Sequence, residues 1–145
     1  MTIQRFDPNT IFLGGQQTVV ADLAASAVIK PGHLVQRFNS GGVIRWQVAT
    51  ADVDGPAAVA LDHPMANKGV DDTYAVGDLM EVGIGRGGSE YWMLIASGQN
   101  VAAGALLGSA GDGTLKTGAT VARFTALENK ATVTVLTRIR VEAIK

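Results

Sequence analysis

The stretch from Val133 to Ala143 has the sequence VTVLTRIRVEA, in which mainly apolar residues alternate with mainly polar ones. Successive side chains of a β-strand point to opposite faces, so this period of two predicts a long strand with one buried face. The polar segment Glu128–Lys130 stands before it, and Val121–Leu127 before that is again strand-like. We expect these two strands to form an antiparallel hairpin around a turn at Glu128–Lys130.

Further upstream, one short phrase recurs three times. A Gly stands two residues before an apolar pair in Ile29–Val35, Ala75–Met80 and Ala102–Leu107. Because Gly readily adopts positive φ, each copy predicts a tight turn that leads into a strand. Each copy is followed by a second turn rich in Gly or Asn and by another strand-like run. Their uneven spacing argues against a solenoid or propeller, which need a fixed period.

The composition agrees with one compact all-β domain. The chain has 145 residues, 18 of them Gly, and only 17% are charged, which favours short strands and turns over helices. The segment 18–27 fits either a strand or a single helical turn, and its periodicity does not decide between them. Strand-like runs follow at 34–38, 43–49, 57–62, 79–84, 91–96, 105–107, 114–116, 121–127 and 131–143.

Charge, cysteine content and hydropathy argue against nucleic-acid binding, disulfides, thiolate metal sites and membrane insertion. The net charge is -1 and no window gathers Lys and Arg, so we expect no nucleic-acid binding. No cysteine is present, which removes disulfides and thiolate metal sites. No run approaches the roughly 18 apolar residues of a membrane-spanning helix, and no signal-like segment opens the chain. We expect a soluble protein made in the cytosol, without a membrane partner.

The first 17 residues differ from the remainder. They combine turn formers with apolar residues that follow neither a helical nor a strand period. We interpret residues 1–17 as an extended N-terminal arm and residues 18–145 as the β-rich body. The arm's apolar side chains have no evident place in a core and are candidates for binding a partner: Ile3, Phe6, Ile11, Phe12 and Leu13.

Candidate catalytic motifs fail on their context. Gly83–Gly88 matches the dinucleotide pattern G-x-G-x-x-G, but a strand follows where a helix is needed, so a hairpin turn is the better interpretation. Ser109 does not stand in a G-x-S-x-G elbow that could pair with the Asp62–His63 dipeptide. His33 and His63 lie in different turns without further ligands in register. We expect no enzymatic activity, no metal and no cofactor.

The segment Glu90–Met93 suggests an interface instead. Three large side chains stand on adjacent positions, so both faces of this strand are apolar. One face belongs to the core, and the other predicts contact with a second copy through Tyr91 and Trp92. The alternative is that Tyr91 lies at the core edge with its hydroxyl in water. Trp46 alternates with Arg45 and Gln47, which predicts a core position.

The order of these phrases resembles the bacteriophage head-decoration, or capsid cement, proteins. The resemblance covers roughly residues 18–145 and rests on Ile29–Val35, Gly55–Asp62, Val76–Val82, Val101–Leu107 and the closing hairpin. It implies a small β-barrel or β-clip (β-tulip-like) body, usually a homotrimer, on the outer surface of the virion head. Such a protein clamps neighbouring major capsid proteins and stabilises the head against the pressure of its DNA. The resemblance carries no catalytic residues.

An apolar arm fits this role, because it could add a strand to a coat-protein sheet. A second interpretation comes from another class. The same turn phrase occurs in antifreeze-like β-clip domains of carbohydrate-processing enzymes, so a small-ligand or carbohydrate-binding module is the alternative. We expect no enzyme domain within these 145 residues for such a module to serve.

Overall fold

A computed structural model describes residues 8–24, 29–50, 57–131 and 137–144, and it contains a closed β-barrel. The barrel strands are β7 (Glu90–Ile95), β11 (Thr137–Ala143), β10 (Phe124–Ala126), β8 (Leu106–Ser109) and β9 (Leu115–Thr117). Neighbours pair antiparallel in this order, and a parallel pair between Ile95 and Leu115 returns the sheet to β7. Strand β1 (Phe12–Gly14) pairs with the other end of β7.

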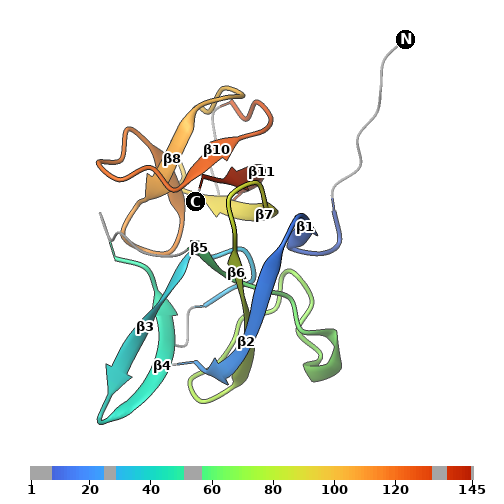
Figure 1. The fold of residues 1–145 in the computed structure, drawn as a ribbon, viewed down its shortest axis with the longest axis vertical. Coiled ribbons are helices and arrows are strands. Elements are labelled where there is room, and N and C mark those ends of the chain that lie inside the picture. Colours follow the sequence, from blue (N-terminus) through green and yellow to red (C-terminus); the bar gives the residue numbers. More distant parts are fainter. Residues whose placement is uncertain (1–7, 25–28, 51–56, 132–136, 145) are drawn as a thin grey trace.

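A three-stranded sheet and a hairpin complete the fold (Figure 1). The sheet has the order β2 (Gln17–Leu23), β6 (Leu79–Gly85) and β5 (Ala57–Ala60), all antiparallel. The hairpin consists of β3 (Val35–Ser40) and β4 (Val43–Val48), and its tip extends away from the barrel. The described residues contain one helical element, the 3-10 turn η1 (Pro64–Ala66). The predicted all-β class with a small barrel is confirmed.

The structure has two hydrophobic cores, which lie on opposite sides of strand β5. The first fills the barrel around Tyr91, Met93, Phe124 and Ile139, and the second lies between the three-stranded sheet and the base of the hairpin. Every residue of β5 is buried, because Ala57 and Val59 face the first core while Ala58 and Ala60 face the second. Trp46 is 2% exposed in the second core, as predicted.

The recurring phrase forms the same turn each time. The amide of the residue after the Gly donates to the carbonyl three residues earlier, from His33 to Lys30 and from Asp78 to Ala75. The third copy repeats this bond within Ala102–Ala105. The central glycines have φ of 94°, 85° and 88°, the left-handed region that a type II turn requires at its third position. Strands β3, β6 and β8 follow these turns, so this prediction is confirmed.

Two predicted turns differ from the structure. Strands β10 and β11 do pair, but the amide of Leu127 donates to the carbonyl of Arg140, so the connection is longer than Glu128–Lys130. Lys130 instead pairs with Val101. The predicted hairpin at Gly83–Gly88 is wrong, because β6 and β7 belong to different sheets. The open segment 18–27 is strand β2 up to Leu23, while residues 25–28 lie outside the described ranges.

Candidate functional site

The predicted arm is wrong for its last residues. Ile11 is fully buried in the barrel core, and Phe12 and Leu13 pack against that core. The carbonyl of Ile11 accepts a hydrogen bond from Trp92 N at 2.8 Å, and its amide donates to Asp62 Oδ1 at 3.0 Å. A partner protein therefore cannot contact Ile11 in this conformation. Ile3 and Phe6 lie outside the described residues, and their binding role stays a prediction.

Tyr91 and Trp92 are covered by this chain itself, which corrects their assignment to an oligomer interface. Tyr91 is fully buried, its ring lies 5.6 Å from that of Phe12, and its hydroxyl donates to Gln17 Oε1 at 2.9 Å. Burial raises the pKa of Tyr91 to about 12. Trp92 is 9% exposed on the opposite face, where the guanidinium carbon of Arg138 lies 5.1 Å from its ring centre.

Arg138 holds three segments together above Trp92. Its guanidinium donates to the carbonyls of Pro31 and Val70 and to Asp71 Oδ1, the last at 2.9 Å. The hydrogen bond from Arg138 lowers the pKa of Asp71. Arg138 was predicted on the polar face of the last strand, yet it is only 9% exposed because its stem covers an apolar ring.

The glycines of the G-x-G-x-x-G pattern make room for neighbouring side chains. A Cβ at Gly85 would lie 2.6 Å from the Tyr91 hydroxyl oxygen, and one at Gly83 would overlap the side chain of Gln17. Only Gly lets the hydrogen bond between Tyr91 and Gln17 lie across β6. Close packing therefore explains Gly83 and Gly85, two of the glycines that match the phosphate-binding pattern in the sequence.

The remaining chemical candidates have structural partners. The Nδ1 of His33 accepts from Lys30 N at 2.9 Å, and burial lowers the pKa of His33 to about 4. The Nε2 of His63 lies 3.5 Å from Glu81 rather than beside Asp62. The hydroxyl of Ser109 donates to the carbonyl of Thr50 at 2.8 Å. In the part of the chain that the structure describes, no three His, Cys, Asp or Glu residues gather to hold a metal, and no helix could span a bilayer.

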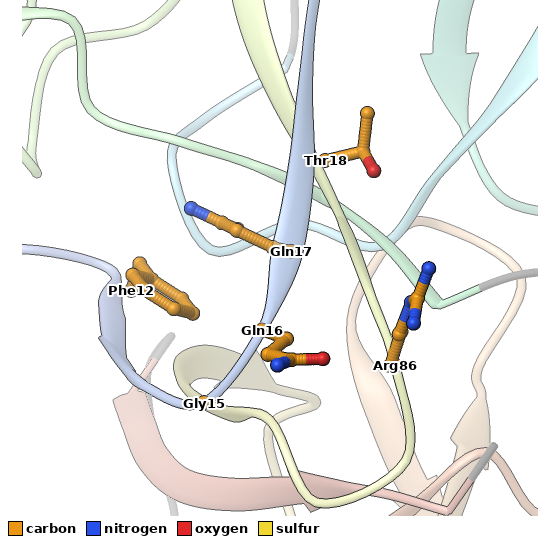
Figure 2. Close-up of a pocket in the computed structure, with 6 residues that line it drawn as sticks. All are labelled: Phe12, Gly15, Gln16, Gln17, Thr18 and Arg86. Atoms are coloured by element: carbon orange, nitrogen blue, oxygen red, sulfur yellow. The ribbon is translucent and has the colours of Figure 1, made fainter.

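One open groove of about 460 Å³ lies where β1 passes into β2. Figure 2 shows Gln16, Thr18 and Arg86 on one side of the strand, with Phe12 and Gln17 on the other. An aromatic ring, two amides, a hydroxyl and a guanidinium line this open groove, although they project from both sides of the strand. These groups suit a small polar ligand with an anionic or hydroxyl-rich surface.

Two exposed apolar faces were missed by the sequence analysis. The first, here called the hairpin face, is the side of β3–β4 that carries Phe38, Val43 and Arg45; the two apolar residues are 41% and 51% exposed. The second, called the sheet face, is the side of β2–β6 that carries Val19, Leu23, Leu79 and Glu81; its apolar residues are 36–51% exposed. The sequence does contain a signal for these faces, because the short strands carry apolar residues on both of their sides.

Comparison with known proteins places the fold. No protein-family model matches the chain, and no curated protein matches it. Among solved structures, it is similar to the N base of the head fiber protein gp8.5 of bacteriophage phi29. The TM-score is 0.56 and the identity 15%, over 86% of this chain and 93% of that one. At this identity the similarity establishes the shared all-β fold.

Proposed function

We propose that this chain is a structural protein of a bacteriophage head that binds the outer surface of the capsid. The observation that carries the proposal is the fold shared with a phage head fiber base over nearly the whole of both chains. The order of turn phrases supports it independently, since these phrases resemble the head-decoration proteins. Fold alone does not define function, so the assignment needs its own test.

The proposed action is to cement neighbouring major capsid proteins and so to strengthen the head. The coat-binding residues that remain available are Ile3 and Phe6, because Ile11 is used by the barrel core. Two large apolar side chains close together can enter pockets or pair alongside a coat-protein strand. The protein would be made in the host cytoplasm and would act in several copies on the virion.

The test uses heads of the phage that encodes this chain, prepared with and without it. Purified protein is mixed with undecorated heads, and binding is measured by co-sedimentation and negative-stain imaging. The Ile3→Asp/Phe6→Asp variant should lose binding, whereas the matched control Thr2→Ala/Gln4→Ala should retain it. Decorated heads should also retain DNA to a higher temperature. Wild-type protein that does not bind its own heads would refute the proposal.

A carbohydrate-binding or small-ligand role is the second candidate, and the groove beside Phe12 and Arg86 favours it. Aromatic rings and planar polar groups are the usual contacts of such ligands. NMR titration of the protein with neutral and acidic sugars tests it. Shifts confined to Gln16–Thr18 and Arg86 that vanish in Arg86→Ala would support this function, and unchanged spectra would exclude it.

A further inference from the structure

The hairpin face is an exposed surface held in a fixed direction. At its base, the Arg37 guanidinium carbon lies 4.7 Å from the ring centre of Trp46, and its Nη1 lies 3.5 Å from Asp22 Oδ2. The first contact lies within the hairpin, and the second joins the hairpin to β2 of the three-stranded sheet. The other side of the hairpin makes neither contact. There Phe38 lies opposite Arg45, and Val43 lies two pairs further on, opposite Ser40. Phe38 and Val43 are therefore diagonal neighbours across the two strands, and they cover each other only partly.

Arg45 on this face has one nitrogen without a partner among the described residues. Its Nε is buried with no hydrogen-bond acceptor among the described residues. Residues 35–48 contain two arginines and no acidic residue, so the hairpin as a whole is positive. Arg37 already contacts Asp22, whereas Arg45 makes no ion pair within the described ranges. An exposed apolar face whose arginine makes no ion pair among the described residues is complementary to an apolar surface that carries a carboxylate.

The sheet face has that chemistry. Leu23 lies opposite Leu79 in the register of β2 and β6, and Ala21 lies opposite Glu81, so these side chains share one face. Val19 continues the apolar row at 50% exposure. The Glu81 side chain is 35% exposed, and its contact is His63 Nε2 at 3.5 Å. The face thus offers apolar side chains around one accessible carboxylate.

We propose that the hairpin face of one copy docks on the sheet face of a second copy, with Arg45 beside Glu81. Within one chain the opposite sides of these elements already pack together in the second core, which contains Trp46, Val82 and Met80. The two exposed faces consequently point away from each other and can only meet between molecules. Both faces are apolar, and the single charge on one face is opposite in sign to the single charge on the other.

This contact joins two different surfaces, so it is head-to-tail and must close into a ring or continue as a filament. Six residues on each strand give a hairpin face of about 20 by 10 Å, or roughly 200 Å². A standard interface buries about 800 Å² on each partner, so a single contact is weak. A closed ring, in which every copy uses both faces, is the stable form.

Cysteine cross-linking tests the contact directly, because the chain has no cysteine of its own. Val43→Cys protein is mixed with a mass-tagged Leu79→Cys protein under mild oxidation. The hairpin-to-sheet dimer should form at least about tenfold faster than a dimer of Val43→Cys with the control Met65→Cys, since Met65 is 96% exposed but lies on neither face. Cross-links at the control rate, or only between two Val43→Cys copies, would overturn the proposal.

A charge exchange tests the pairing of Arg45 with Glu81. Arg45→Glu and Glu81→Arg should each lower the oligomer fraction in sedimentation velocity, with an approximately tenfold weaker association, and the double variant should restore it. Circular dichroism melting checks that every variant is folded. Single variants that associate like the wild type would refute the pairing. Since no heads are used, failure here leaves the proposed function untouched, and the reverse also holds.

Discussion

Replacing Ile11 with Ala should destabilise the whole body, although sequence alone places this residue in an arm. Ile11 is fully buried in the barrel core, where its backbone also bonds to Trp92 and Asp62. Truncating a buried Ile to Ala costs about 2–5 kcal/mol, because apolar contacts are lost and a cavity remains. A loss near 3 kcal/mol corresponds to a melting temperature lower by roughly 10 °C in a domain of this size.

The assay is urea unfolding followed by tryptophan fluorescence, since Trp92 lies directly beside this residue in the fold. Met65→Ala is the matched control, because Met65 is 96% exposed and its truncation should change stability by less than about 0.5 kcal/mol. Deleting residues 1–14 should act like Ile11→Ala or more strongly, while deleting residues 1–7 should not. Equal midpoints for Ile11→Ala and Met65→Ala would refute the assignment of Ile11 to the core.

Three further predictions concern turns and titrations. Gly32→Ala should destabilise more than Gly77→Ala in thermal melts: both sites have positive φ, but only at Gly32 would a Cβ meet Trp92 O at 3.0 Å. The lowered pKa of His33 means that the unfolded state binds the extra proton, so stability should fall by a few kcal/mol from pH 6.5 to 4, and His33→Asn should flatten that slope. The raised pKa of Tyr91 means that the unfolded state loses its proton first, so stability should fall between pH 10 and 12, less so in Tyr91→Phe.

Turn chemistry made the positions of several strands along the chain readable from the sequence. Gly32, Gly77 and Gly104 each stand where a type II turn needs positive φ, and a strand follows each of them. Such signals lie within four residues, so one sequence suffices to find them. The alternation predicted for Val133–Ala143 is confirmed over Thr137–Ala143, where Ile139, Val141 and Ala143 all face the core, while residues 132–136 lie outside the described ranges.

Contacts between distant segments could not be read in this way. Strand β1 has three residues, too few to show a period, and it exists because β7 offers it a free edge. The second face of β7 was predicted to contact another copy of the chain, but Arg138 from β11 covers Trp92 on that face. Barrel closure depends on the single pair of Ile95 with Leu115. Each of these facts depends on which strands become neighbours, and local patterns do not encode that.

The correction at Ile11 also bears on how the protein could hold a capsid. Burial of Ile3 and Phe6 would gain about 3–6 kcal/mol at 1.5–3 kcal/mol per side chain. Association alone costs about 4–15 kcal/mol, so one copy would bind a coat protein weakly. Copies joined through the hairpin and sheet faces would bind together, and their combined affinity could exceed the single affinity by orders of magnitude. If both proposals hold, Arg45→Glu should reduce occupancy on heads with the coat-binding residues intact, and Glu81→Arg in the same chain should restore it.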